Sequence, residues 1–280
     1  MRADRVYYAD GIHPNFHRVR HAIARHLGPS IQTFDLKKLS TLEVKVLDLS
    51  YNRGDLLYPD LILELPFFKK LKILKLKQTN FFHTDPEAMV SAIARTNIKG
   101  LDLTSNFIGN STLSLHGLKL RSLRASNTMI GADAPLDGLL VPELECLDLS
   151  HNDLGSKKGE EKLAALGAYL RQSKTLFSLN MSYNNLNAQS DGVMEEFISS
   201  LEVLESNLKG FSNHDFRGNF SRTSPEVSAA LEKFHQRRTK REPRWRRMRV
   251  MLWIREQEEN ICSTLPMEIL RFILSFLSSV

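Results

Sequence analysis

LECLDLSHNDL, residues 144–154, carries the pattern that decides the fold. An apolar residue is followed by two residues, Leu, one residue, an apolar residue, two residues and then Asn. The six copies of this pattern begin at Val44, Leu71, Ile98, Leu120, Leu144 and Leu176. Thr79 and Thr128 replace Asn in two copies, and Gly54 replaces the apolar residue that ends the first. Self-similarity at steps of 22 to 32 residues predicts an array of stacked repeats.

The alternating core of each copy predicts a short strand. Leu147 and Leu149 would point to one side, and the residues between them to the other. One strand cannot bury such a pair, but stacked neighbours form a continuous apolar column. Asn152 follows where the chain must turn. Its side-chain amide can form hydrogen bonds with backbone N–H and C=O groups that the turn leaves without a partner. We therefore expect a ladder of Asn side chains, weaker at Thr79 and Thr128, where only a hydroxyl is present.

These residues resemble the leucine-rich repeat family, in particular its ribonuclease-inhibitor-like, intracellular type. The resemblance implies an α/β solenoid with a curved parallel sheet, convex helices or loops, and helical caps. We assign residues 44–222 to the repeats, with a degenerate seventh copy at Phe211-x-x-His214-x-Phe216-x-x-Asn219. A surface that holds another molecule is the function that such a fold implies.

Apolar spacings of three and four predict where helices cover the array. Residues 86–96 (PEAMVSAIART) place Met89 and Ile93 on one helical face, and residues 159–172 do the same with three leucines. The short steps around residues 110–118 and 132–139 leave room only for loops or a single turn.

The N-terminal 43 residues read as a cap. Residues 14–27 have the periodicity of an amphipathic helix that Gly28 and Pro29 end, and residues 31–36 alternate as a first strand. His17 and His21 lie four apart on that helix, a spacing that suits a metal. No third ligand is in view, so we interpret them as a solvated face and predict no metal.

Composition indicates the cellular compartment in which the chain works. The 280 residues are 42% hydrophobic, enough for a sizeable core, and include two cysteines. The N-terminal sequence shows no secretory signal pattern, and no apolar run reaches the length of a membrane span. Disulfide-bonded caps cannot be built from two cysteines, so we expect a reducing, cytoplasmic location, or the host cytosol for a secreted bacterial effector.

Positive charge is concentrated in residues 237–255, which hold nine basic residues and one acidic residue. The rest of the chain therefore sums to −2, and the basic signal belongs to this segment and not to the repeat surface. Arg-rich sequence with Trp245 and Trp253 suits nucleic acid or an anionic membrane. The same residues also suit a capping helix with a charged exterior, which is the interpretation we favour.

The C-terminal segment 223–280 ends in LPMEILRFILSFLSSV, which resembles the opening helix of an F-box. In that family this helix packs on a Skp-type adaptor of ubiquitin ligases. The resemblance covers about sixteen residues, and further F-box helices do not follow. The alternatives are an adaptor-docking helix, in a substrate receptor or host-directed effector, and a plain capping helix. The adaptor-docking residues would be Leu265, Pro266, Glu268, Ile269 and Ile273.

Two rows of side chains are candidates for contact with a partner. The row at the middle of the strands alternates in sign from Asp48 to Asp148, so we expect it largely to neutralise itself. The flanking row has Tyr at both ends and polar residues between, a composition typical of recognition surfaces. Our predicted partner-binding residues on the concave face are therefore Tyr51, Gln78, Ser105, Asn127, His151 and Tyr183.

No motif for catalysis or for a cofactor is visible. Asp102 and Asp148 lie two strands apart with Arg124 between them, and Cys146 and His151 fall on different parts of the turn. We therefore predict a non-catalytic protein-recognition module without cofactors. The alternative is a stand-alone scaffold or inhibitor whose terminal helices only close the array.

Overall fold

The computed structural model of the chain describes residues 6–8, 21–24, 44–52, 61–79, 85–108, 113–130, 136–156, 159–208 and 213–219. The chain divides into two compact units, Met1–Ser228 and Ala229–Val280. All described residues belong to the first unit, so the basic segment and the F-box-like helix lie outside them.

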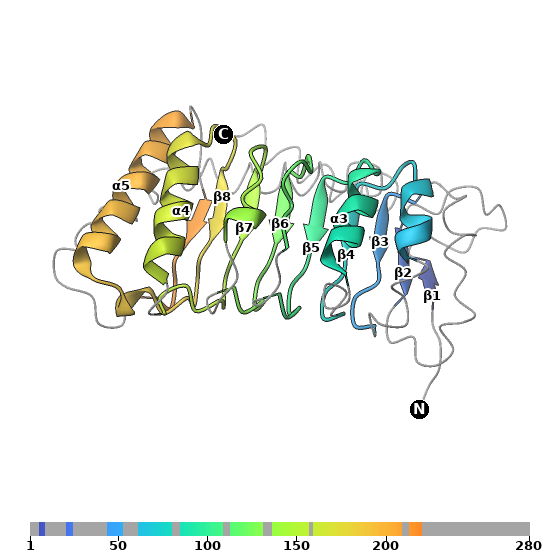
Figure 1. Cartoon of the computed structure of the whole chain (residues 1–280), viewed down its shortest axis with the longest axis horizontal. Helices are drawn as coiled ribbons and strands as arrows, with labels where there is room; N and C mark the ends of the chain where they lie inside the picture. The colour runs from blue at the N-terminus through green and yellow to red at the C-terminus, as the bar shows by residue number, and fades with distance from the viewer. Residues whose placement is uncertain are drawn as a thin grey trace, which may run out of the picture. The chain divides into compact units, whose positions relative to one another are not determined.

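The described residues contain one sheet of nine strands, placed side by side in chain order (Figure 1). The strands are β1 (Val6–Tyr8), β2 (His21–Ala24), β3 (Val46–Asp48), β4 (Ile73–Lys75), β5 (Gly100–Asp102), β6 (Ser122–Arg124), β7 (Cys146–Asp148), β8 (Ser178–Asn180) and β9 (Asn213–Asp215). β1 pairs antiparallel with β2, and every later pair is parallel. Each predicted repeat supplies one strand, and the degenerate seventh supplies β9. The fold is thus an α/β leucine-rich-repeat solenoid, as predicted.

The register of the sheet aligns the central residues of successive strands, and these residues form the predicted apolar column. Leu47, Leu74 and Leu101 lie opposite one another in β3 to β5, and the column continues through Leu123, Leu147 and Leu179 to His214. These leucines are all buried. Burying one such side chain stabilises a fold by about 1.5–3 kcal/mol, so the column is a large part of the core.

The predicted N-terminal helix is wrong at residues 21–24. These residues form β2, which pairs with β3 so that Ala22 lies opposite Leu47. Hydrogen bonds to a neighbouring strand outweigh a weak helical periodicity, since propensity yields to tertiary pairing. The remaining residues of the expected helix, and the strand expected at 31–36, lie outside the described residues.

Helices and short turns cover one face of the sheet (Figure 1). The two helices predicted to cover the repeats appear as α3 (Pro86–Ala94) and α4 (Gly159–Gln172). Asp85 caps α3 by accepting a hydrogen bond from the backbone N–H of Ala88 at 2.9 Å. The short step before β7 contains a single turn, η4 (Asp137–Leu139), as expected.

A third long helix was not predicted. α5 (Asp191–Asn207) follows the short turn η5 (Leu186–Ala188) and packs along α4, burying Phe197, Leu201 and Leu204. The first step likewise holds a helical turn at 61–64 that continues into η2 (Leu65–Phe67). No helix among the described residues is long and apolar enough to span a bilayer.

Candidate recognition surface

The six predicted partner-binding residues share one unusual backbone conformation. We call them the turn row: Tyr51, Gln78, Ser105, Asn127, His151 and Tyr183. Their φ angles lie between 52° and 63°, in the left-handed region. Gly218 occupies the same position in the seventh repeat, with φ of 73°. A non-glycine residue in this region costs roughly 1–2 kcal/mol, and Gly or Asn fits it best.

The turn row lies at one edge of the sheet. Each member comes three residues after its strand ends, at the C-terminal ends of the parallel strands. The prediction of a concave-face row is therefore corrected to a row along the rim of the sheet. The left-handed turn takes the chain out of the strand at this point, so these side chains do not continue the alternation of the strand.

A backbone ladder holds the turn row in line. The N–H of Tyr51 donates to the carbonyl of Lys77 in the next repeat at 2.7 Å, and the N–H of His151 donates to that of Ser182 at 3.0 Å. The other four members make the equivalent bond at 2.8 to 2.9 Å. Neighbouring row members consequently keep the strand spacing of about 4.8 Å.

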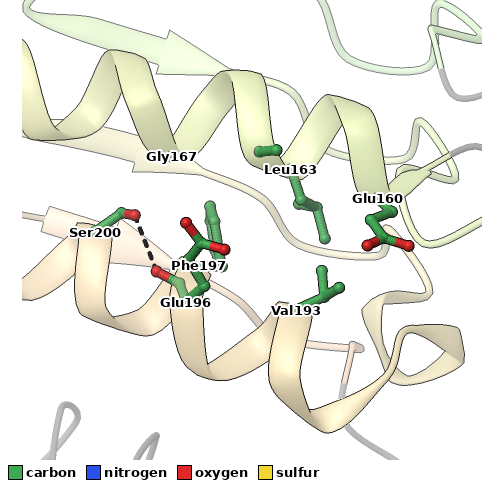
Figure 2. Close-up of a pocket in the computed structure, with 8 residues that line it drawn as sticks. Glu160, Leu163, Gly167, Val193, Glu196, Phe197 and Ser200 are labelled. Atoms are coloured by element: carbon green, nitrogen blue, oxygen red, sulfur yellow. Dashed lines mark hydrogen bonds between the residues drawn. The ribbon is translucent and has the colours of Figure 1, made fainter.

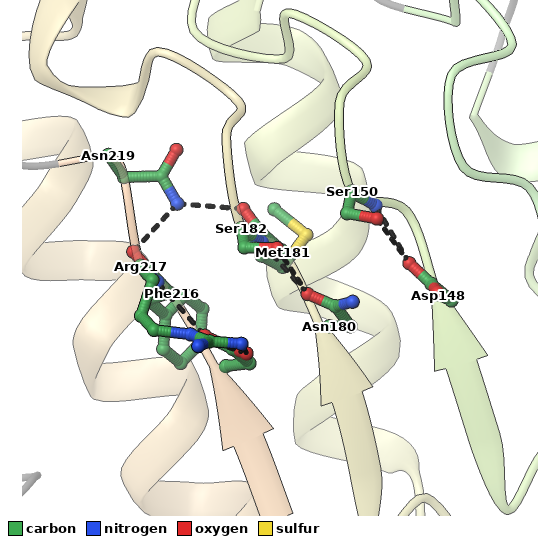
Figure 3. Close-up of polar contacts among 9 residues, drawn as sticks. Asp148, Ser150, Asn180, Met181, Ser182, Phe216, Arg217 and Asn219 are labelled. Carbon is green, nitrogen blue, oxygen red and sulfur yellow. Dashed lines mark hydrogen bonds and ion pairs between the residues drawn. The ribbon is translucent and has the colours of Figure 1, made fainter.

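The predicted Asn ladder lies directly beneath the row. The side-chain amide of Asn184 donates to the carbonyls of Leu149, one repeat back, and of Met181 in its own repeat, at 2.8 and 2.9 Å. Its Oδ1 accepts from the backbone N–H of Asn152 at 3.0 Å. Asn219 repeats the pattern in the seventh repeat, as Figure 3 shows. The side chain of each Asn therefore joins its own repeat to the preceding one.

The two Thr rungs make fewer side-chain hydrogen bonds to backbone carbonyls than the Asn rungs. The hydroxyl of Thr79 donates to the carbonyl of Leu76 in its own repeat at 2.7 Å, while its N–H donates to Oδ1 of Asn106 at 2.9 Å. Thr128 does the same with Ala125 and Asn152. A hydroxyl lacks the second donor with which Asn reaches back one repeat.

The side chains of the middle row, which runs from Asp48 to Asn180, form fewer ion pairs with one another than we expected. One ion pair forms in it, between Arg124 and Asp102 at 3.9 Å. Its acidic and amide side chains instead accept a hydrogen bond from the N–H two residues ahead, as Asp148 does from Ser150 at 3.0 Å. Asn180 repeats this contact with Ser182 (Figure 3). These side chains shape the start of the turn, so they hold the turn row rather than mainly cancelling one another.

Aromatic contacts order the C-terminal end of the turn row. The rings of His151 and Tyr183 stack at 4.6 Å between centroids and 14° between planes. On its other side Tyr183 covers Gly218, where a Cβ would overlap Cδ1 of the ring. Tyr183 nevertheless remains 54% exposed. A large ring held on two sides is a suitable contact for a partner, because little side-chain entropy is lost on binding.

The other end of the row is also held by its neighbours. The ammonium group of Lys77 lies 5.4 Å from the ring centre of Tyr51, within the range of a cation–π contact. Asn127 donates to the hydroxyl of Ser105 at 3.3 Å in the middle of the row. Two exposed apolar side chains, Phe107 and Met129, lie two residues beyond Ser105 and Asn127.

Charge divides the repeat region into two unlike parts. Residues 44–130 hold twelve Lys and Arg against seven Asp and Glu, whereas residues 131–208 hold five against thirteen. The net charges are therefore +5 and −8. Our expectation that the repeats carry no basic signal is wrong, because the opposite charges of the two parts conceal each other in the total.

A small cleft of about 60 Å³ lies between α4 and α5. Glu160 and Glu196 line it beside the apolar side chains of Leu163, Val193 and Phe197 (Figure 2). No member of the turn row lines this cleft.

Two groups near the C-terminal repeats have shifted pKa values. Burial raises the pKa of Tyr169 to about 12, opposed by a hydrogen bond with Ser173. Its hydroxyl donates to the carbonyl of Val141 at 2.9 Å. The hydrogen bond to Asp215, and then the charge of that residue, raise the pKa of Arg217 above its usual value.

Most of the remaining sequence-based candidates fall outside the described residues. Leu265, Pro266, Glu268, Ile269 and Ile273 lie outside the described residues, as does His17. Within the described ranges, no group of three His, Cys, Asp or Glu side chains could hold a metal ion. Cys146 lies in β7, whereas His151 lies in the turn beyond it.

Comparison with known proteins finds solved structures that are similar to the chain. No family model and no curated protein sequence matches the chain. The crystal structure of the leucine-rich repeat-containing protein LegL7 from Legionella pneumophila is similar, with 22% identity and a TM-score of 0.49. The match covers 67% of this chain and 61% of LegL7. The strand register and the Asn ladder, rather than this likeness, define the fold described above.

Proposed function

We propose that the chain is a non-catalytic protein-recognition module whose contact surface is the turn row. One observation carries the proposal: five of six successive left-handed turns bear Tyr, Gln, Ser or His, although Gly or Asn would fit this backbone at lower cost. Four of the six side chains are exposed. Conformational strain that is kept at an exposed site is a reason to infer a role for the side chain.

The ends of the row supply the anchors. Tyr is enriched at the centres of protein interfaces because it buries a large apolar area and still offers a hydroxyl. Tyr183 is already held between His151 and Gly218, and Tyr51 lies under Lys77. Phe107 and Met129 add apolar area next to the middle of the row, where the row itself is polar.

The test replaces both tyrosines by asparagine. Tyr51→Asn/Tyr183→Asn removes both rings, but Asn tolerates the left-handed conformation, so the free energy of unfolding should stay within about 1 kcal/mol of wild type. The immobilised variant should lose the proteins that the wild-type chain captures from a cell lysate, as measured by quantitative mass spectrometry.

Leu63→Ala/Phe67→Ala is the matched control, because both side chains are large, apolar and exposed but lie away from the row. This control should capture the same proteins as wild type. Unchanged capture by the tyrosine variant, or equal loss in both variants, would show that the row is not the contact surface.

A finer proposal concerns the C-terminal helix and the cell compartment. We propose that LPMEIL, residues 265–270, docks a Skp-type adaptor and that the chain works in a reducing, cytoplasmic compartment. The sequence pattern and the two cysteines support these ideas. Pull-down with a purified Skp-type adaptor, comparing wild type with Leu265→Ala/Pro266→Ala, tests the docking. Equal binding or no binding by both proteins would remove the adaptor role.

We also propose that the repeats are of the ribonuclease-inhibitor-like type. The long convex helices α4 and α5 support this assignment.

A further inference from the structure

A basic edge runs along the side of the sheet opposite the turn row, where the strands begin. We define the basic edge as the six cationic residues that precede β4, β5 and β6: Lys69, Lys70, Lys72, Lys99, Lys119 and Arg121. Five of these side chains are exposed, and Lys99 is half-buried. The edge belongs to the part of the chain with a net charge of +5.

The register of the strands keeps these cations close. The N–H of Lys99 donates to the carbonyl of Lys72 at 2.7 Å, and that of Arg121 donates to the carbonyl of Lys99 at 2.8 Å. Three cations therefore follow at intervals of about 4.8 Å. Arg121 also forms an ion pair with Glu145 at 3.2 Å, which is where the basic edge ends.

The α4–α5 cleft has the complementary chemistry. Its apolar wall consists of Leu163, Val193 and Phe197 (Figure 2). Its carboxylates are Glu160 and Glu196, and Glu196 also forms an exposed ion pair with Arg171 at 3.6 Å. A volume of about 60 Å³ admits roughly four to six atoms of water size, which is the size of the end of a lysine side chain. Lysine buries its methylene stem against apolar surface while its ammonium group meets a charge.

We propose that the basic edge of one copy docks on α4 and α5 of a second copy, with a lysine side chain entering the cleft. Charge complementarity between the two parts of this chain, +5 and −8, argues for a second copy as the occupant. The contact joins two different surfaces, so a copy that uses one still offers the other, and copies add head to tail. This surface is separate from the turn row and its partner.

Sedimentation analysis of the full chain at increasing concentration tests the contact. In about 0.1 M salt the average mass should rise above that of a monomer. It should return to the monomer mass in about 1 M salt, because the screening length falls from about 10 Å to about 3 Å. A chain that stays monomeric at low salt, or associates equally at both salt concentrations, would overturn the proposal.

Charge reversal identifies the two surfaces. Lys72→Glu/Lys119→Glu reverses exposed residues of the basic edge, and Glu195→Lys/Glu196→Lys reverses exposed residues of α5. Each variant should associate at least roughly tenfold more weakly than wild type, since attraction becomes repulsion. Circular dichroism and thermal melting should confirm that both variants fold.

The combined variant with all four reversals keeps the net charge of wild type and should associate again, and so should a mixture of the two double variants. Failure of both restorations would contradict head-to-tail docking.

Binding of a single-stranded oligonucleotide to the full chain is the last measurement. If the oligonucleotide binds a monomeric chain, and Lys72→Glu/Lys119→Glu abolishes that binding, the basic edge serves nucleic acid and the proposal is overturned.

Discussion

The repeats before residue 131 and those after it follow one strand pattern but are stabilised differently. In the first part Thr79 and Thr128 interrupt the Asn ladder, and α3 is the one long helix among its described residues. In the second part Asn152, Asn184 and Asn219 follow without interruption, and α4 packs against α5. The backbone register thus defines the array, while side-chain rungs and convex helices decide how stable each part is. We expect the first part to open before the second.

Asn184→Ala should have the largest effect. In this variant the carbonyl of Leu149 still accepts a hydrogen bond from the side chain of Asn152, and the carbonyl of Met181 still accepts one from the side chain of Asn219. The backbone N–H groups of Asn152 and Leu154, however, lose their acceptor in a buried turn. Two orphaned donors should lower the free energy of unfolding by about 2–4 kcal/mol.

Urea unfolding measures this loss, and hydrogen exchange should show it first at residues 149–154. A cost below about 1 kcal/mol would mean that the Asn ladder does not make the second part more stable than the first.

Thr79→Val should have a smaller effect. Valine keeps the shape of threonine and the N–H bond to Asn106. It loses the hydroxyl bond to Leu76 and the longer contact of the same hydroxyl with Oδ1 of Asn106 at 3.2 Å. The carbonyl of Leu76 still accepts from Asn106 at 2.7 Å. The expected loss is therefore about 1 kcal/mol in the same urea assay. A loss equal to that of Asn184→Ala would show that the two kinds of rung do not differ.

Tyr169→Phe should have the smallest effect at neutral pH and a distinct effect in alkali. The pKa of Tyr169 is raised to about 12 in the fold from about 10 in the unfolded chain. The neutral phenol thus contributes stability that is present below pH 10 and is lost as the pH rises toward 12.

The free energy of unfolding measured from pH 9 to pH 12 should fall more steeply for wild type than for Tyr169→Phe. Because Tyr169 lies on α4, hydrogen exchange should place the change in the second part of the array. Parallel curves for the two proteins would argue against the shifted tyrosine.

Particular residues show what could be predicted from the sequence. Leu147 and Asn152 predicted a strand and a rung because their roles depend on local spacing alone. α5 was missed although Met194, Phe197 and Leu201 have helical spacing, because the seventh repeat is degenerate and its long step was not used. β2 was predicted as helix because its pairing with β3 is a contact between distant residues.

The candidate site was predicted by position but not by geometry. Tyr51 and Tyr183 were selected for their composition, and nothing in their spacing indicated a positive φ. Gly218 carried that signal, since a glycine at the same repeat position points to a backbone that other residues adopt at a cost. The charge division was missed because a net charge for the whole chain averages opposite signs.

The left-handed turn also affects how this surface can change over time. The backbone ladder and the buried Asn rungs fix the path of the chain, and neither uses the side chain of a row residue. Replacing one row residue by another therefore changes the chemistry at one position and leaves its neighbours in place. The six positions are sites of variation on a constant frame, in which the touching side chains of Ser105 and Asn127, and of His151 and Tyr183, vary as pairs. The molecule can therefore acquire a new partner by a few substitutions without redesigning its core.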